Sequence, residues 1–536
     1  MRGGRETVEW DVVVVGAGTS GAPLAARLAD AGRRVLVLEA GADHARPDDF
    51  PADLRDAARM AAAVPGHPAN WDLTGVLTEE VTFPVPRGRV AGGSSALNGG
   101  YFIRGTRADL DGWAAAGNDL WSYDAVLPSF VRLEADREYG DRPGHGADGP
   151  VPVRRPRHGH PLADALGAAA AELGAPEEPD KNADGAPGWG PVPLNVAEGV
   201  RVNTAMAYLS PRRGHPGLTV RGGVHVRRVV VEAGRAVGVE TADGVARAGE
   251  VVLAAGAVGS PQLLLLSGIG PADDLRALGV DVVADVPGVG ADYTDHPDVY
   301  VTWRPARRLP MPRDLHPLHG VLNTPDDLEV LPWLKPFSRV MVPRTSAGVA
   351  RVLGRPRATL RALRGASLHR LLDTARRRDD LFLGVALQRE DSRGRLTLTG
   401  PDPGVQPRLE YRYLATDSDR RRMRQGVRLA AELLRTAAMA PLVAERTGLP
   451  DDVLASDREL DRWIRRSLAT AVHLAGTARM GPDTDPGAVV DQHLRVRGIE
   501  GLRVVDTSVM PTVTSRGPAA PAVAIGERAA ELLTGT

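Results

Sequence analysis

Residues 11–41 read DVVVVGAGTSGAPLAARLADAGRRVLVLEAG, and this stretch decides the fold. A short apolar run leads into the glycine pattern Gly16-x-Gly18-x-x-Gly21. An alanine- and leucine-rich helical pattern follows, and a second apolar run ends at Glu39. The order predicts strand, glycine turn, helix and strand, which is the first βαβ unit of a Rossmann-type α/β domain.

Each part of this pattern has a physical role in binding a dinucleotide. Gly16 permits the tight turn, Gly18 lets the backbone approach a pyrophosphate, and Gly21 lets the helix pack closely on the strand. The helix N-terminus offers free N–H groups to the phosphates. Glu39 follows the last glycine by 18 residues and can accept hydrogen bonds from a ribose. A glycine pattern alone is weak, but all four features in register predict a dinucleotide site.

Composition narrows the class of protein. The 536 residues carry a net charge of −1, so no global field favours nucleic acid or an anionic membrane. The absence of cysteine excludes disulfides, thiolate catalysis and iron–sulfur clusters. The N-terminus carries no apolar signal segment, and no apolar run approaches the roughly 20 residues that span a bilayer. We therefore expect a cytoplasmic protein.

Two glycine-rich stretches interrupt the chain. Residues 88–104, GRVAGGSSALNGGYFIR, combine glycines, hydroxyls and an Asn without an apolar period. Such a loop can present backbone N–H groups to a flat or anionic ligand, although a surface loop has the same composition. Residues 285–296, DVPGVGADYTDH, form a second loop of this kind.

The segment 136–195 is rich in Pro, Gly, His and Asp, with one helical pattern near 162–173. It is typical of a lid or excursion on the substrate side. Nothing at metal-ligand spacing accompanies its histidines, so the sequence predicts solvated loop histidines and no metal site. These histidines are His145, His158 and His160.

A change of pattern indicates a second domain. A β-meander from about residue 218 precedes a buried strand at 251–255, as in many flavin-binding Rossmann proteins. Beyond residue 300, alternating strands predict an antiparallel sheet with one covered face, and two helices follow. The strands are expected at 299–303, 381–388, 395–399 and 408–413, and the helices at 417–436 and 457–468.

The expected division of the chain is discontinuous. The dinucleotide-binding domain takes 1–135, 196–299 and 467–536, and the substrate domain takes 136–195 and 300–466. Within the latter, residues 339–378 form an arginine-rich insert with an amphipathic face. Such an insert suits a membrane surface or an acidic partner, or simply solvent in an arginine-rich chain.

The C-terminal region carries the densest pattern. AVHLAGTARMG at 471–481 is followed by a strand that ends at Asp506, and then by a helix that begins after Pro518. An acid at a strand end beside a helix start suits a polyol chain at the carboxyl edge of a sheet.

Several motifs together resemble the glucose–methanol–choline (GMC) flavin oxidoreductases. The fingerprint at 16–39 resembles the family's FAD site, and residues 88–111 its first signature, with a departure at Ala91. GAVGSPQLLLLSGIG at 256–270 is similar to the second signature. The H-x-x-G-T-x-x-M-G block from His473 and the terminal VVDTSVMPT…AIGE block extend the resemblance to the end of the chain.

The resemblance implies a GMC fold that binds FAD across the Rossmann half. Members with covalent flavin carry a His at the place that looks like Leu97 here, so we expect dissociable FAD. The implied FAD-contacting residues are Gly16, Gly18, Thr19, Ser20, Gly21, Glu39, Ala40, Arg89, Gly92, Gly93, Ser94, Asn98, Gly99, Val224, Asp506, Pro518 and Ala519.

The implied reaction is oxidation of an alcohol, in which a base removes the O–H proton while hydride leaves for flavin N5. His473 matches the family's catalytic His, and a neutral imidazole is a suitable base near neutral pH. The family's usual second His or Asn falls on Gly517, which has no side chain to bind the substrate oxygen. A backbone N–H, Arg516 or a lid residue would then substitute, or the mechanism differs.

NGGYF at 98–102 and SRGPAA at 515–520 also resemble the mycofactocin-associated branch, in which a peptide-derived redox carrier passes electrons towards the respiratory chain. The substrate is then an alcohol or such a carrier, and the arginine-rich insert a docking face at the membrane periphery. A dehydrogenase is favoured over an oxidase. A hydroxynitrile lyase and a non-catalytic flavin electron-transfer partner stay open as alternatives.

Overall fold

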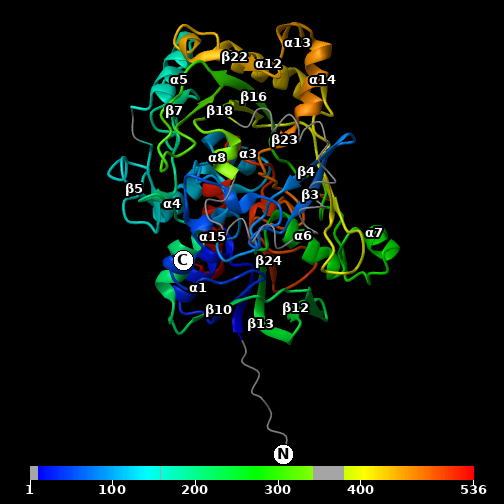
Figure 1. Cartoon of the computed structure of the whole chain (residues 1–536). Helices are drawn as coiled ribbons and strands as arrows, with labels where there is room; N and C mark the ends of the chain where they lie inside the picture. The colour runs from blue at the N-terminus through cyan, green and yellow to red at the C-terminus, as the bar shows by residue number, and fades with distance from the viewer. Residues whose placement is uncertain (1–9, 157–158, 342–378, 536) are drawn as a thin grey trace, which may run out of the picture.

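A computed structural model describes residues 10–156, 159–341 and 379–535 (Figure 1). Most of the arginine-rich insert and His158 lie outside the described residues. No helix among the described residues has the length and apolar character needed to cross a bilayer.

The first sheet has the predicted Rossmann arrangement. Its strand order is β10-β2-β1-β13-β12-β11, and β24 pairs with β13 on the side away from β1, next to β12. Strands β10, β2, β1, β13 and β24 are parallel, whereas β13, β12 and β11 form the predicted antiparallel meander. The bounds are β1 Trp10–Val15, β2 Val35–Glu39, β10 Leu218–Gly222, β11 Arg228–Glu232, β12 Arg235–Thr241, β13 Gly244–Leu253 and β24 Leu502–Val504.

Helices α1 (Gly21–Asp30) and α15 (Ala519–Thr534) pack against each other beside this sheet, although 489 residues separate them in sequence (Figure 1). Both are rich in alanine, and the alanines at 22, 25, 26 and 29 of α1 are buried. Small side chains allow the helices to approach closely. The side chain of buried Glu527 in α15 accepts hydrogen bonds from Arg27, Arg132 and Tyr208.

The second sheet is antiparallel, as predicted, in the order β22-β16-β19-β18-β17-β7, with β23 paired to β16. Helices α12 (Asp417–Leu433) and α14 (Asp457–Ser467) contact it and confirm the two predicted helices. The strands are β7 Trp189–Pro191, β16 Pro297–Pro305, β17 Gly320–Asn323, β18 Leu328–Trp333, β19 Leu381–Leu387, β22 Val443–Thr447 and β23 Ala469–Thr470.

Two of the four strands predicted for this sheet lie elsewhere. Strands β20 (Arg395–Thr397) and β21 (Arg408–Glu410) join β3 (Leu73–Thr78) and β4 (Val81–Val85) in a separate four-stranded sheet. The prediction of one sheet was therefore wrong. Alternation shows which face of a strand is buried, but it does not show which strand lies next to it.

The segment 136–195 is built into the second half of the molecule rather than lying over it as a free lid. Strand β7 pairs with β17 of the second sheet, and helix α5 (Pro161–Glu172) packs against both. His145 and His160 are not solvated, contrary to the prediction, because each is 8% exposed. Burial here comes from partners distant in sequence.

The other elements are short. They are α2 Ala52–Arg55, α3 Arg107–Ala115, α4 Tyr123–Leu133, α6 Gly256–Leu266, α7 Ala272–Ala277, α8 Phe337–Met341, α13 Asp451–Ala455, β5 Glu134–Asp136, β6 Val151–Val153, β8 Val196–Ala197, β9 Val200–Arg201, β14 Ile269–Gly270 and β15 Ala284–Asp285. Single helical turns connect several of them, among them one at Gly93–Ala96 inside the first predicted loop.

A glycine pair tests how much the fold depends on the fingerprint turn. Gly16 and Gly32 both have positive φ, +104° and +82°. A Cβ at Gly16 would strike the Ala254 carbonyl, whereas a Cβ at Gly32 would have no neighbour within 4 Å. We expect Gly32→Ala to lower the free energy of unfolding by about 1–2 kcal/mol. Gly16→Ala should cost roughly 4 kcal/mol or more, because backbone must also move. Equal losses in thermal or denaturant unfolding would contradict this.

Candidate active site

The fingerprint loop and the first glycine-rich loop meet at their glycines. A Cβ at Gly93 would lie 2.8 Å from the Cα of Gly18, so the two backbones are in contact there. Gly92 has φ +93° and packs against the Asn203 side chain. This contact leaves backbone N–H groups, rather than side chains, at the start of α1. That arrangement fits a pyrophosphate, as predicted.

Glu39 lies at the carboxyl end of β2 and is 6% exposed. Its carboxylate accepts the backbone N–H groups of Ala17 (3.0 Å) and Gly41 (2.8 Å). These bonds fix both oxygens beside the glycine turn, where a ribose would lie. The Val224 N–H donates to the Glu39 carbonyl at 2.9 Å, so Val224 also lies at this end of the cradle, as predicted for the adenine side.

The remaining predicted cofactor residues lie along the same edge of the sheet. The Ser20 hydroxyl donates to the Ala522 carbonyl, which ties the start of α1 to α15, and Pro518 caps α15 before Ala519. The Ser94 hydroxyl accepts from Gly88, and Asn98 Oδ1 accepts from Gly100. The guanidinium of Arg89 lies 4.9 Å from the ring of Trp71. Thr19, Ala40 and Gly99 belong to the same loops.

Asp506 was predicted to lie beside the ribityl or pyrophosphate part of the cofactor. Its buried carboxylate accepts hydrogen bonds from Gly256, Ser260 and Ser508. The side chain therefore joins the end of β24 to the start of α6. Polyol binding by this carboxylate would have to share an acceptor that protein donors already occupy.

A histidine pair lies where the two halves of the molecule meet. Nδ1 of His473 is 2.9 Å from Nδ1 of His296, and the two rings meet edge-on at 86°. Nε2 of His296 is 3.0 Å from the Thr514 carbonyl. Sequence reasoning noted the glycine loop that ends at residue 296 but missed this histidine, because only folding pairs it with His473.

The hydrogen bonds assign the protons of the pair. A carbonyl oxygen only accepts, so Nε2 of neutral His296 carries a proton and its Nδ1 is an acceptor. Nδ1 of His473 must then donate, which leaves Nε2 of His473 as the free basic atom. Burial lowers the pKa of His296 to about 4. Burial, with His296 and Arg87 nearby, lowers the pKa of His473 well below its usual value. Both rings are therefore neutral at pH 7.

Local backbone geometry aims His473 at its partner. Pro297 and Asp298 pair in antiparallel register with Thr470 and Ala469, but Thr294 pairs with Ala475, so the strand of His473 bulges. Val472 in this bulge has φ +64°, an outlier for a β-branched residue. Such strain persists where surrounding contacts hold it, and it concentrates at functional sites.

Asp295 holds both histidines through their backbones. Its Oδ1 accepts the N–H groups of His296 (2.6 Å) and His473 (2.7 Å). Burial raises the pKa of Asp295 to about 6, so the carboxylate is ionised above that pH. The carboxylate therefore fixes the two histidine backbones relative to each other.

Gly517 faces the free edge of His473, as the sequence predicted. A Cβ there would lie 3.7 Å from His473 Nε2 and 3.7 Å from the Tyr101 ring. Arg516 does not fill this place, because its guanidinium binds Glu178 and the Lys181 carbonyl. After His473, Tyr101 is the side chain nearest to the position that Gly517 leaves open, and its hydroxyl donates to Glu329 at 3.1 Å.

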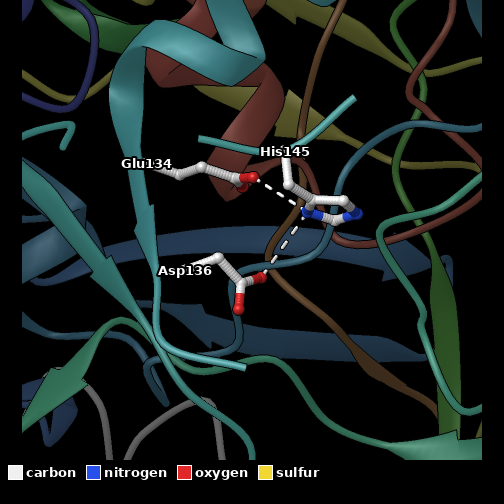
Figure 2. Close-up of side chains that lie close together, drawn as sticks. All are labelled: Glu134, Asp136 and His145. Carbon is white, nitrogen blue, oxygen red and sulfur yellow. Dashed lines mark hydrogen bonds and ion pairs between the residues drawn. The ribbon is translucent and has the colours of Figure 1, made fainter. Parts of the chain in front are cut away.

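Glu134, Asp136 and His145 lie together in the segment predicted to be a solvated loop (Figure 2). His145 Nδ1 is 3.0 Å from Glu134 and 3.6 Å from Asp136, and its Nε2 is 3.0 Å from Asp180. Three such ligand atoms could hold a metal ion, but Arg104 already pairs with Glu134 and Arg155 with Asp136. The cluster is a charge-balanced ion-pair hub that fixes this segment.

This hub should make stability depend on pH. Burial opposes charge on His145, but hydrogen bonds to Asp180 and Glu134 outweigh it and raise the pKa of His145 to about 9. Because the folded pKa exceeds the unfolded value, the stabilisation is present below about pH 6.5 and is lost as pH rises through about 9. We expect His145→Gln to lower the free energy of unfolding by a few kcal/mol at about pH 6, at ~1.4 kcal/mol per pKa unit, and by much less near pH 10. A pH-independent difference in denaturant unfolding would refute this.

Comparison with known proteins agrees with this geometry. Sequence models of the N- and C-terminal regions, both described as GMC oxidoreductase, match residues 10–298 and 390–526. An uncharacterized GMC-type oxidoreductase of Rhodococcus erythropolis is 38% identical over 98% of both chains. The oxygen-dependent choline dehydrogenase of Photobacterium profundum is 34% identical over 98% of this chain and 93% of its own. The crystal structure of pyridoxine 4-oxidase from Mesorbium loti has a TM-score of 0.84 at 30% identity, covering 98% of this chain and 100% of that one.

The chain is an FAD-binding flavoenzyme, and it belongs to the GMC oxidoreductase family. The predicted GMC fold and cofactor are therefore confirmed. The cradle of glycines, Glu39 and helix α1 fits FAD because two backbones meet where a Cβ would intrude. The individual site residues stay predictions with the placements given above.

Proposed function

We propose that this protein oxidises an alcohol with FAD as the oxidant and His473 as the base. Choline and pyridoxine, which appear in the names of the similar proteins, both carry a primary alcohol. The observation that carries the proposal is the hydrogen-bonded chain from Thr514 through His296 to His473. It presents an unprotonated, neutral Nε2 at the position that faces Gly517.

The residues of the chain account for the movement of the proton. The substrate hydroxyl donates to Nε2 of His473 and transfers its proton there as the alcohol is oxidised to a carbonyl. The imidazolium that forms keeps its Nδ1–H bond to His296, and this charge-assisted hydrogen bond stabilises it. FAD, when bound, supplies the two-electron oxidant that accepts the hydride from the carbinol carbon.

His473 acts without a second side chain at the substrate oxygen. Gly517 can offer only backbone there, and Arg516 is held by Glu178. A single positioned base contributes about 10²- to 10⁴-fold. Other groups around His473 must then orient the rest of the substrate.

We further propose that FAD is dissociable and that the chain has the discontinuous domains given above. We propose a dehydrogenase rather than an oxidase. We propose that the protein is cytoplasmic and that any membrane association is peripheral. The substrate is an alcohol or a peptide-derived redox carrier of the mycofactocin type. Residues 342–378, most of the proposed docking insert at 339–378, are outside the part of the chain that the structure describes. No nucleic-acid partner is proposed, because the net charge is −1.

The direct test is anaerobic reduction of the FAD-loaded protein by a panel of alcohols and by the reduced carrier. We expect an alcohol to bleach the oxidised-flavin absorbance, and His473→Ala to slow this by about 10²- to 10⁴-fold while FAD content stays normal. Normal reduction by His473→Ala would refute the role of His473. Bound FAD that nothing reduces would instead favour a lyase or an electron-transfer partner. Admitting air to the reduced protein then distinguishes an oxidase from a dehydrogenase.

The pH profile of this reduction tests the neutral base. His473 must be unprotonated to accept the proton, and its pKa lies well below the usual value because of burial. We expect the rate of flavin reduction to stay constant from about pH 8 down to about pH 6.5 and to fall only at lower pH. A rate that already falls between these two values would show a solvent-like imidazole and contradict the assignment.

Two substitutions at residue 296 test the tautomer. Leu removes the acceptor for His473 Nδ1–H and the donor to Thr514, so we expect flavin reduction to slow by about 100-fold. Gln offers one amide oxygen and one NH₂ group, which can replace the acceptor and the donor. His296→Gln should therefore recover much of the rate that His296→Leu loses. Equal losses in both variants would show that the ring only fills space.

A further inference from the structure

Four buried or partly buried histidines share one local hydrogen bond, in which Nδ1 accepts the backbone N–H two residues further on. They are His67, His160, His215 and His316. Nε2 of each ring then carries the proton. His67 Nε2 lies 3.2 Å from Asp53, and His160 Nε2 lies 3.0 Å from the Pro310 carbonyl. Nε2 of His316 is buried, and it has no hydrogen-bond partner among the residues that the structure describes.

The tautomer of His316 follows from its neighbours. Its Nδ1 lies 3.1 Å from the Leu318 N–H and 3.0 Å from the Leu318 carbonyl. A buried N–H without a partner is rarer than a carbonyl with a free lone pair, so Nδ1 accepts and Nε2 is the donor. Burial lowers the pKa of His316 to about 3, and the ring is neutral.

A free acceptor lies close to this free donor. Asn195 is 3% exposed, and its Nδ2 donates to the Val202 carbonyl at 2.8 Å, which fixes the orientation of the amide. Its Oδ1 is buried and has no partner in the described part of the chain. Leaving such an atom without a partner forfeits its hydration without compensation, so a bound group is expected there.

The two atoms approach the same point beside Gly100. A Cβ on Gly100 would lie 3.5 Å from Asn195 Oδ1 and 3.8 Å from His316 Nε2. Gly100 has φ +71° and lacks the side chain that would fill this space. The donor and the acceptor can therefore face a small polar group held between them.

This point adjoins the proposed alcohol site. Gly100 is followed directly by Tyr101, whose ring lies 3.7 Å from the Cβ position of Gly517, next to His473. On the other side, a Cβ on Gly99 would meet Leu318 and Met60. Gly100 and Tyr101 are consecutive residues, and consecutive Cα atoms are about 3.8 Å apart. The space beside Gly100 and the ring of Tyr101 therefore belong to neighbouring positions of the chain.

The chemistry of the pair selects the ligand. One N–H donor and one carbonyl acceptor match a hydroxyl, which both donates and accepts. A carboxylate would be repelled by Asn195 Oδ1. A substrate ammonium would meet the buried Arg201 guanidinium and Lys335, whose positive charges act on His316.

We propose that His316 and Asn195 form a hydroxyl-binding subsite, and that the substrate is an alcohol with a second, neutral hydroxyl group, such as a diol or polyol. The inference rests on the proposed alcohol oxidation at His473. It assigns the orientation of the substrate, which Gly517 cannot provide, to a pair of side chains beside Gly100, the residue that precedes Tyr101.

The test compares linear diols, from ethanediol to hexanediol, with mono-alcohols of the same chain length. Anaerobic flavin reduction gives a rate constant and a dissociation constant for each. We expect at least one diol to be preferred over its mono-alcohol by about tenfold or more, since one well-placed neutral hydrogen-bond pair is worth about 1–1.5 kcal/mol. No preference at any chain length would overturn the proposal.

His316→Asn is the discriminating variant. An Asn side chain can accept the N–H two residues on, as His316 does, but it removes the Nε2 donor. The diol preference should fall to about one, and His316→Asp, with the same acceptor, should act likewise if the Asn variant folds poorly. His67→Asn is the matched control, because it changes a histidine with the same local bond whose Nε2 binds Asp53. It should keep the wild-type preference.

Other outcomes separate the possible failures. Equal loss for diols and mono-alcohols in His316→Asn would show that the pair holds only a structural water, and would overturn the subsite. If no alcohol reduces the flavin, the proposed function fails, and binding is then read from the shift of the oxidised-flavin spectrum. The subsite would still be supported if the wild type binds a diol tenfold more tightly than its mono-alcohol and His316→Asn binds the two equally. Equal binding in the wild type would overturn it.

Discussion

The close approach of two backbones at Gly18 and Gly93 is the constraint on which the cofactor half of the structure depends. Parallel strands β1, β13 and β24 end at one edge, so the turns that follow them must share a small space. A Cβ at Gly16 or Gly93 would strike backbone, and therefore only glycine allows the loops to meet. Their N–H groups can then face a pyrophosphate, while the Glu39 carboxylate is fixed beside them by two backbone hydrogen bonds.

The chemical half depends on an arrangement that joins the two sheets. His296 directly precedes β16 and His473 follows β23, and the pairing of these strands brings the histidines together. Asp295 binds both backbones, and the strained Val472 turns His473 towards its partner. Since the Thr514 carbonyl can only accept, one chain of hydrogen bonds fixes both tautomers. The basic edge of His473 therefore faces the space beside Gly517 without any charge on the pair.

Near the proposed base His473, buried charged groups are paired with one another. Arg516, Glu178 and Lys181 satisfy one another in a buried network that anchors the segment 136–195. His145 and its carboxylates anchor the same segment from another side. Nε2 of His316 and Oδ1 of Asn195 are among the buried side-chain atoms without a partner in the described part of the chain, and both lie near the Cβ position of Gly100, the residue before Tyr101.

The sequence by itself determined the elements whose signal is local. The glycine fingerprint, Glu39, the meander and the helices at 417–433 and 457–467 follow from spacing and residue type, and the family resemblance implied the places of His473 and Gly517. Only the tertiary structure decided pairings between distant segments. Strands β20 and β21 join β3 and β4, His145 is buried among carboxylates, Arg516 turns away from the site, and His296 meets His473 across 177 residues. Local periodicity fixes which face of an element is buried, whereas partners far apart in sequence are chosen by packing of the whole chain.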